Sequence, residues 1–419
     1  MSEKLSIILN FVKFRWFSRF TNTSVLHKHQ QKLFDKQKKF IKQNSLFYKN
    51  KDSLPIMDKT NFMDCFNDIN TVNIDKNQAM DFAIECEQTR KFNKKLNGVT
   101  VGLSSGTSGH RGIFLVSDKE RALWAGAMLA KTLQKGHLFG VRIAFFMRAN
   151  SELYETVKSQ FIKFKFFDMF RDIDESLCEL EKFRPTILVA PPSCLLQTVK
   201  RQNARQIKPN KVISIAEVLE HADAEIIKKA FDVEVVHQIY QCTEGFLGIT
   251  CEHGTLHINE DIIKIEKEQI GKRRFVPIIT DLKRRAQPVI RYRLNDILVE
   301  KEEPCKCGSA FLALEKIEGR QDDVFEFEGT NGNGIVPIFP DFLRRCMLLA
   351  EDVKEYRIQQ ISTSEITILA DNLSEKTKRQ ITDELNKLSV NSHFKFPDIT
   401  FKPYEYDNRR KLKRVEKLC

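Results

Sequence analysis

Short apolar runs alternate with longer amphipathic stretches through the middle of this chain. Four runs have the length and the β-branched or aromatic content of strands, namely VRIAFFM (141–147), TILVAPP (186–192), KVISI (211–215) and VEVVHQIY (233–240). Helix-like stretches lie before and between them, for example at 118–135 and 153–164. Strands that alternate with helices bury their apolar faces in an α/β fold with a largely parallel sheet. We therefore expect an α/β protein.

The flanking segments differ from this middle part and predict a second domain. Residues 21–100 are charged and mostly helical, and after Asp261 the pattern becomes shorter and more β-like, with the hairpin-turn sequence GTNGNG at 329–334. At 419 residues the chain exceeds one typical domain. We expect a large domain over 1–320, with parallel or mixed sheets, helices and a short β-rich subdomain. A small α+β domain over 321–419 would follow it.

Charge and hydropathy disfavour several classes of protein. The net charge is +12, but Lys and Arg are spread along the chain together with Asp and Glu, which disfavours a nucleic-acid-binding protein. The longest uncharged apolar run near the start, 5–12, is too short to span a bilayer. A docked N-terminal helix is favoured there, and peripheral membrane contact by a surface helix stays open. We expect a soluble, cytoplasmic protein whose ten cysteines are reduced or bind metal.

A loop rich in Ser, Thr and Gly precedes the first of the apolar runs. It consists of Ser104, Ser105, Gly106, Thr107, Ser108 and Gly109. Glycines let a backbone approach a ligand closely, and hydroxyl groups add hydrogen-bond donors, so such a loop suits a polyphosphate. It is not a P-loop, because no Lys-Ser/Thr pair follows its second glycine. By itself the loop is equally compatible with a plain flexible connection.

Four further motifs follow in a fixed order and decide between these interpretations. They are YQCTE (240–244), PVIRYRLND (288–296), GRQDD (319–323) and RKLKRV (410–415). With the loop, they resemble the adenylate-forming superfamily of acyl-CoA synthetases, adenylation domains and luciferases. The likeness is strongest to the branch of phenylacetate–CoA ligase and coenzyme F390 synthetase, which also has CxCG shortly before GRxDD. The N-terminal third is similar to F390-synthetase-related adenylate-forming enzymes.

The resemblance implies a role for each motif in binding ATP with Mg²⁺. The loop would wrap the β- and γ-phosphates, and Tyr240 would stack on adenine. Thr243 would bond the α-phosphate and Glu244 would hold Mg²⁺, which prefers oxygen ligands. Asp296 would bind the ribose hydroxyls.

The last two motifs would serve the smaller, mobile domain. Arg320 would lie near the nucleotide, and Asp322 would be the hinge between the AMP-binding domain and the C-terminal domain. Lys411 would be the catalytic lysine that neutralises charge in the transition state, in preference to Lys413.

Two positions depart from the family pattern. The family loop continues with Lys or Pro after its second glycine, whereas here His110 and Arg111 follow. Either Arg111 supplies the missing cation or the γ-phosphate is held less tightly. The glycine that usually follows the adenine-stacking tyrosine is Gln241 here, which would alter the lining of the acyl pocket.

Two Cys/His segments predict a structural zinc site. CEHGTLH (251–257) and PCKCGS (304–309) supply Cys251, His257, Cys305 and Cys307, and C-x-C-G is a tight knuckle that turns both sulfurs toward one ion. Some phenylacetate–CoA ligase relatives have such residues, and the family pattern favours His257 over His253. Free thiols are the alternative.

The motifs together predict an ATP-dependent ligase. A carboxylate would attack ATP to give an acyl-AMP, and a thiol, CoA or the pantetheine of a carrier protein, would accept the acyl group. One alternative is a nucleotidyltransferase that adenylates a hydroxyl, as coenzyme F390 synthetase does. Another is a nucleotide-binding module without catalytic activity.

Overall fold

The chain folds into two compact units. The computed structural model describes residues 3–104, 111–133, 139–148, 150, 157, 159, 162–201, 207–332, 334–350, 352–407 and 411–419. Unit 1 comprises Met1–Leu294 and Leu298–Lys316, and unit 2 comprises Asn295–Ile297 and Ile317–Cys419. The chain therefore passes between the units at three points: between Leu294 and Asn295, within β13 (Asp296–Glu300) and within β14 (Ala313–Arg320).

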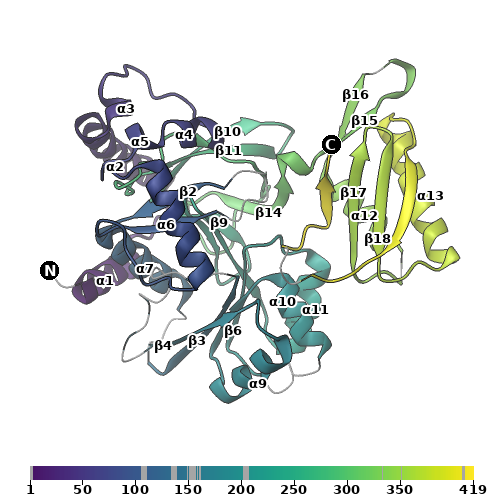
Figure 1. Ribbon diagram of the computed structural model, residues 1–419, viewed down its shortest axis with the longest axis horizontal. Coiled ribbons are helices and arrows are strands. Elements are labelled where there is room, and N and C mark those ends of the chain that lie inside the picture. The colour runs from purple at the N-terminus through teal and green to yellow at the C-terminus, as the bar shows by residue number, and fades with distance from the viewer. Residues whose placement is uncertain are drawn as a thin grey trace. The chain divides into compact units, whose positions relative to one another are not determined.

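A large mixed sheet dominates unit 1 (Figure 1). Among the described residues it has 12 strands in the order β10-β11-β13-β14-β9-β8-β7-β6-β5-β3-β4, with β12 beside β11. The block β4-β3-β5-β6-β7 is parallel, and β7-β8, β8-β9, β9-β14, β11-β13 and β10-β11 are antiparallel. The parallel strands are β3 (Val141–Met147), β4 (Ile162–Asp168), β5 (Ile187–Ala190), β6 (Lys211–Ile215) and β7 (Val236–Cys242). The others are β8 (Gly245–Thr250), β9 (Leu256–Ile258), β10 (Ile263–Gln269), β11 (Arg274–Asp281) and β12 (Tyr292–Arg293).

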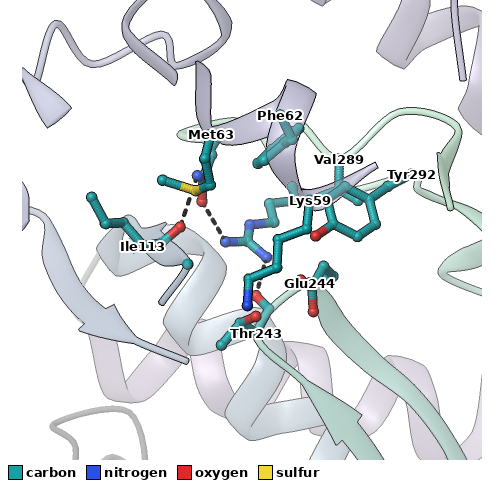
Figure 2. A pocket seen from close by; sticks show the side chains of 11 residues that line it. Lys59, Phe62, Met63, Ile113, Thr243, Glu244, Val289 and Tyr292 are labelled. Carbon is teal, nitrogen blue, oxygen red and sulfur yellow. Dashed lines mark hydrogen bonds between the residues drawn. The ribbon is translucent and has the colours of Figure 1, made fainter. Parts of the chain in front are cut away.

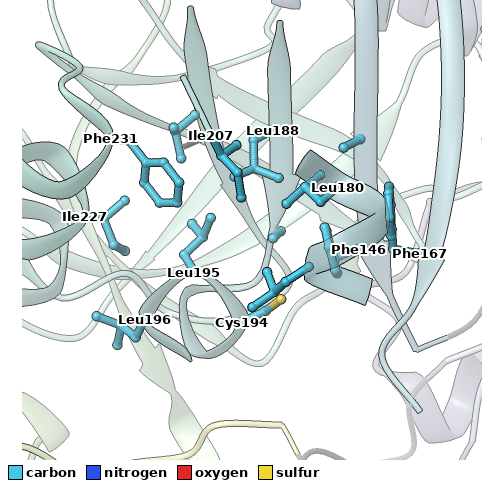
Figure 3. Close-up of a cluster of buried hydrophobic side chains, with 14 of the residues drawn as sticks. Phe146, Phe167, Leu180, Leu188, Cys194, Leu195, Leu196, Ile207, Ile227 and Phe231 are labelled. Atoms are coloured by element: carbon cyan, nitrogen blue, oxygen red, sulfur yellow. The ribbon is translucent and has the colours of Figure 1, made fainter. Parts of the chain in front are cut away.

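Helices cover both faces of the parallel block because successive strand residues point to opposite sides. On one face Phe146 and Leu188 pack against α9 (Ile173–Phe183), α10 (Pro192–Lys200) and α11 (His221–Phe231), as Figure 3 shows. On the other face Ile143 and Val189 pack against α7 (Asp118–Thr132). The result is a three-layer α/β arrangement, which confirms the predicted fold class.

The N-terminal third of unit 1 is helical apart from one small sheet. β1 (Thr100–Leu103) and β2 (Ile113–Val116) pair antiparallel and flank the Ser/Thr/Gly loop. The helical elements are α1 (Glu3–Val12), η1 (Lys13–Phe17), α2 (Thr23–Asn44), α3 (Leu46–Lys49), α4 (Lys59–Asp64), α5 (Phe66–Ile69) and α6 (Lys76–Thr89). Within the described part of the chain, no helix combines the length and the apolar character needed to cross a membrane.

Unit 2 has its own sheets and its own core. Its four-stranded sheet has the order β19-β18-β17-β20, and β15-β16 is a separate hairpin. Its elements are η3 (Gln321–Asp323), β15 (Phe325–Glu328), η4 (Thr330–Gly332), β16 (Ile335–Ile338), α12 (Pro340–Leu348), β17 (Tyr356–Ser362), β18 (Glu365–Ala370), α13 (Glu375–Ser392), β19 (Asp398–Pro403) and β20 (Val415–Lys417). Phe325, Phe327 and Ile381 are fully buried in its core.

Two local predictions have clear outcomes. The hairpin turn at 329–334 is confirmed, because β15 and β16 pair antiparallel on either side of it. The helix predicted over 153–164 is wrong for residues 162–164, which begin β4. The reason is the alternation of apolar and charged residues in IKFKFF, which is a period of two and fits a strand with one side against helices.

Candidate functional site

Thr243 and Glu244 lie in the turn that leaves the carboxyl end of β7, the last parallel strand of the sheet. In open α/β sheets this edge is where ligands bind. The two residues line a small pocket in unit 1, shown in Figure 2. The pocket is lined by Lys59, Phe62, Met63, Gly112, Ile113, Thr243, Glu244, Arg284, Gln287, Val289 and Tyr292.

Glu244 is positioned by the hydroxyl group of Tyr292. Burial, the nearby charge of Glu244 and the hydrogen bond that Tyr292 donates to it all raise the pKa of the tyrosine, so it stays a donor. The ring of Tyr292 packs edge-on against Phe62, with 5.2 Å between the ring centroids. A carboxylate held in this way at a pocket wall offers oxygen to a hard cation such as Mg²⁺.

A buried arginine and a glutamine connect the pocket turn to the strand that follows the loop. Arg284 donates to the carbonyl oxygen of Thr243 at 2.6 Å and to Oε1 of Gln287 at 2.8 Å. Gln287 in turn accepts from the Leu115 amide at 3.0 Å and donates to the Ile113 carbonyl at 3.0 Å. β2 and the Thr243 turn are therefore fixed to each other by a buried polar network.

Lys59 brings a positive charge into the pocket from the first residue of α4. Figure 2 shows its side chain extending toward Thr243, with Glu244 nearby. A Cβ placed on Gly112 would lie 3.5 Å from Cε of Lys59 and 3.5 Å from Oγ of Ser104. Gly112 also donates its amide to that Ser104 Oγ at 2.7 Å. The lysine thus lies at the base of the Ser/Thr/Gly loop.

Arg111, the cation considered from the sequence, has carboxylate partners in this structure. Its guanidinium forms two hydrogen bonds with Glu87, at 2.8 and 2.6 Å, and a third with the carbonyl oxygen of Ser104 at 3.0 Å. A bidentate arginine–carboxylate pair fixes the position of both groups. Arg111 therefore anchors the end of the loop to α6. Its part in binding phosphate stays a prediction.

The remaining predicted nucleotide residues of unit 1 are placed as follows. Tyr240 is buried in β7 opposite Gly248 of β8, and its stacking on adenine stays a prediction. Gln241, next to it, accepts a hydrogen bond from Nε1 of Trp124 at 3.2 Å. Ser105, Gly106, Thr107, Ser108 and Gly109 lie outside the described residues.

Asp296, Arg320, Asp322 and Lys411 all belong to unit 2. There Asp322 accepts a hydrogen bond from the side chain of Asn295, whose backbone carbonyl also accepts from the Gln321 amide at 2.7 Å. Asn295 precedes Asp296, so the third and fourth motifs meet within this unit. Lys413 is paired with the largely buried Asp323 at 2.9 Å, and this contact holds the C-terminal segment beside the GRQDD motif. The hinge and catalytic roles stay predictions.

The four predicted zinc ligands come together at one place in unit 1. Cys251 follows β8, His257 is in β9, and Cys305 and Cys307 lie in the turn between β13 and β14. Their ligand atoms all lie within 4.8 Å of one another. The Sγ atoms of Cys251 and Cys305 are 3.6 Å apart, and Sγ of Cys307 is 3.4 Å from Nε2 of His257.

The chemistry of this donor set fits a tetrahedral zinc ion. Metal–sulfur bonds of about 2.3 Å place two sulfurs of a tetrahedron about 3.8 Å apart, close to what is found here. Nδ1 of His257 lies 3.1 Å from the carbonyl oxygen of Phe311, a contact that leaves Nε2 as the ligand atom. Gly308 has φ +70°, a left-handed conformation that lets the knuckle turn.

Comparison with known proteins identifies the fold. No sequence-family description and no curated protein sequence matches the chain. Among solved structures, 2-hydroxyisobutyryl-CoA ligase in the postadenylation state with R3-HIB-AMP gives a TM-score of 0.69 at 15% identity, over 93% of this chain and 88% of that one. An open conformation of that ligase with 2-HIB-AMP and CoA gives 0.56 at 15% identity, over 100% and 91%.

A more distant structure has the same fold. The amide bond synthetase McbA from Marinactinospora thermotolerans gives a TM-score of 0.52 at 12% identity, over 76% of this chain and 67% of that one. The chain therefore has the fold of the adenylate-forming ligases.

The sequence analysis missed four pocket residues with polar or charged side chains. They are Lys59, Arg284, Gln287 and Tyr292. Tyr292 could have been predicted as a site residue, because it lies inside the PVIRYRLND motif. The other three carry no local signal, since their role depends on contacts with distant parts of the chain.

Proposed function

We propose that this protein is an ATP-dependent adenylate-forming ligase that activates a carboxylic acid and transfers the acyl group to a thiol such as CoA. We place it in the branch of phenylacetate–CoA ligase and coenzyme F390 synthetase. The observation that carries the proposal is the pocket at the end of β7, which combines Thr243, Glu244 and the ammonium group of Lys59. The fold shared with 2-hydroxyisobutyryl-CoA ligase, a structure with an acyl-AMP bound, supports it.

The proposed reaction has two steps. A carboxylate oxygen of the substrate attacks the α-phosphorus of ATP, the bond to pyrophosphate breaks, and an acyl-AMP forms. The sulfur of the acceptor thiol then attacks the acyl carbon, AMP leaves, and the thiol proton passes to solvent. Displacement at phosphorus demands mainly correct positioning and stabilisation of negative charge.

The pocket residues suit these demands. Thr243 would donate its hydroxyl to the α-phosphate, and Glu244, held by Tyr292, would be a ligand of Mg²⁺, which screens the phosphates when bound. Lys59, next to the loop base, would supply the cation that the loop itself lacks. Asp296, Arg320 and Lys411 keep their proposed roles at the ribose, near the nucleotide and at the reacting carboxylate. Asp322 remains the proposed hinge.

The Cys/His cluster is proposed as a structural zinc site. Its four ligands are all contributed by the protein, which leaves no open position for substrate and is typical of structural rather than catalytic zinc. It would join the β8–β9 hairpin to the β13–β14 turn.

Exchange of labelled pyrophosphate into ATP tests the function. We expect exchange that depends on an added aromatic, fatty or other carboxylic acid and is lost in Glu244→Gln and Lys411→Met. Exchange that requires an alcohol or phenol would instead establish a hydroxyl-adenylating nucleotidyltransferase. Nucleotide binding without exchange under any substrate would establish a module without catalytic activity.

A further inference from the structure

The N-terminal helical segment, α1 with η1, has two apolar stripes rather than one. Residues 3–17 contain apolar side chains at helical spacing on opposite sides of the segment. The inner stripe includes Ile7, Phe11 and Phe14, of which Phe14 is buried. The outer stripe is exposed and consists of Leu5, Ile8, Leu9, Val12, Trp16 and Phe17.

The α1–η1 segment is fixed to α7 along its whole length. Figure 1 shows α1 and α7 as neighbouring helices. At the start of α7, Arg121 forms an ion pair with Glu3 at 2.6 Å. In the middle, a Cβ on Gly126 would lie 2.5 Å from Cβ of Asn10, so the two helices touch at the backbone. At the far end Arg15 donates to the carbonyls of Ala130 and Leu133, both at 2.8 Å.

Because α1 is held in this way, its outer stripe cannot turn inward. Phe17 is 77% exposed and Trp16 53% exposed, although both are large apolar side chains. Isolated exposed apolar residues are ordinary, but six on one face of one helical segment indicate a binding surface.

The exposed charged side chains of the segment itself are mostly positive. Lys4, Lys13 and Arg19 are exposed along the segment, while Glu3, the single acidic residue of 3–19, is paired with Arg121. Lys13 also has cationic neighbours on other elements. The pKa of Lys283 is lowered to about 8, first by burial and then by Lys13, Lys36 and Arg285.

We propose that the outer face of α1 and η1 binds an anionic lipid surface. An apolar stripe with an interfacial tryptophan, bordered by Lys and Arg, is the arrangement that lies in the headgroup region of a bilayer. Each basic residue near such a surface adds attraction to anionic lipids. A second copy of this chain is less suited to bind this face. In a two-fold symmetric dimer the same patch lies on both sides of the interface, so the basic residues of one copy would face those of the other and repel them.

Co-sedimentation of the full-length protein with vesicles tests this surface. The probes are vesicles of phosphatidylcholine alone and vesicles with about 30% phosphatidylglycerol. We expect binding to the anionic vesicles that falls at least about tenfold for neutral vesicles and at high salt. Tryptophan fluorescence should shift to shorter wavelength on binding, and the shift should be absent when Trp16 is replaced and only Trp124 remains.

Matched variants distinguish membrane binding by the outer stripe from non-specific hydrophobic binding to vesicles. The double variant Trp16→Ser, Phe17→Ser should bind at least about tenfold more weakly, since two large apolar groups leave the bilayer. Phe139→Ser is the control, because Phe139 is equally exposed, at 75%, but lies outside the segment. Equal binding by the double variant and the control would overturn the proposal. So would absence of binding to anionic vesicles, or a dimer in vesicle-free solution that the double variant abolishes.

This inference does not depend on the proposed function. Pyrophosphate exchange measured without vesicles should be the same in the double variant and in the unmodified protein. Loss of vesicle binding with exchange intact therefore concerns the surface alone.

Discussion

Two basic residues, Lys59 and Arg111, lie at the ends of the Ser/Thr/Gly loop and have different contacts. Arg111 is paired with Glu87 and bonded to Ser104, whereas Lys59 reaches the pocket beside Thr243 and Glu244. A guanidinium held by a bidentate carboxylate is fixed in place beside that carboxylate. Because Lys59 lines the pocket together with Thr243 and Glu244, we propose it as the cation that would meet the phosphates there.

We predict that Lys59→Met lowers the rate of pyrophosphate exchange at least about tenfold. The reason is the loss of a positive charge that would stabilise the phosphates in the transition state. Lys49→Met is the control, because Lys49 is an exposed lysine of the neighbouring α3. Steady-state exchange assays on both variants provide the measurement, and equal rates would assign Lys59 a structural role only.

Lys211 is a buried cation at the start of β6. Its ammonium group donates to the carbonyl of Thr132 at 2.8 Å. Burial, with a smaller contribution from Arg15 and against the attraction of Glu252, lowers its pKa from 10.5 to about 8. In the folded protein the lysine therefore releases its proton at a lower pH than in the unfolded chain.

This difference predicts a pH dependence of stability. Below about pH 8 both states carry the proton, and the folded state bears the cost of a buried charge. Between about pH 8 and about pH 10 the unfolded chain binds more protons, so the free energy of unfolding should rise with pH, by about 2 kcal/mol from this group. Denaturant unfolding at several pH values measures it. Lys211→Met should remove the contribution of this group and leave that of Lys283, whose pKa is also lowered to about 8, while Lys208→Met, at an exposed position, should preserve the full rise.

At the scale of secondary-structure elements, the sequence predicts the layers well because the parallel strands are nearly continuous apolar runs. β3, β5 and β6 lie inside the predicted runs, and β7 (Val236–Cys242) overlaps the run at 233–240 and ends two residues beyond it. β4 was partly misassigned as a helix, since its alternation follows directly on a helix-like stretch. Lys59 could not be found in this way. It is one of 68 basic residues, and its place in the pocket depends on how α4 packs near β12.

The Cys/His cluster is the element-scale feature that sequence spacing predicted most directly. C-x-C-G defines the knuckle locally, and the CEHGTLH segment links β8 to β9 and includes the first two residues of β9. Pairing of β14 with β9 then brings His257 opposite Ala313, a few residues after Cys307. The metal itself stays a prediction.

We predict about one equivalent of zinc in the purified protein, measured by elemental analysis. Cys305→Ser should lose most of the metal and lower the midpoint of thermal unfolding, because the link between two hairpins is removed. Cys178→Ser is the control, since Cys178 is exposed on α9. Protein with full activity and stability but no metal would show that the thiols serve as an ordinary hydrogen-bonded cluster.

At the scale of the whole molecule, each unit has a core of its own. The core of unit 2 is built from residues 325–415, with Phe325, Met347 and Ile358 completely buried. A separate core is the usual condition for a domain to fold alone. The predicted domain boundary after Arg320 lies beside the proposed hinge at Asp322, whereas the longer segment of unit 2 begins at Ile317. The hinge itself stays a prediction.

We predict that residues 317–419, expressed alone, fold cooperatively. Circular dichroism and a single unfolding transition in denaturant would show this. A fragment that starts at Val324 should behave alike, because the buried cluster begins at Phe325. A fragment without a cooperative transition would mean that the core of unit 2 is insufficient by itself.

Residues Asn295–Ile297 belong to unit 2, although the chain on both sides of them belongs to unit 1. This arrangement determines whether the protein stays together after proteolytic cleavage. A protease that cuts between Lys316 and Ile317 would leave these three residues covalently on the amino-terminal fragment. Asn295 would still accept a hydrogen bond from the backbone amide of Gln321 and donate one to the side chain of Asp322, both on the other fragment. The nicked protein should therefore stay together through this interlocked segment, and the two pieces should separate only under denaturing conditions.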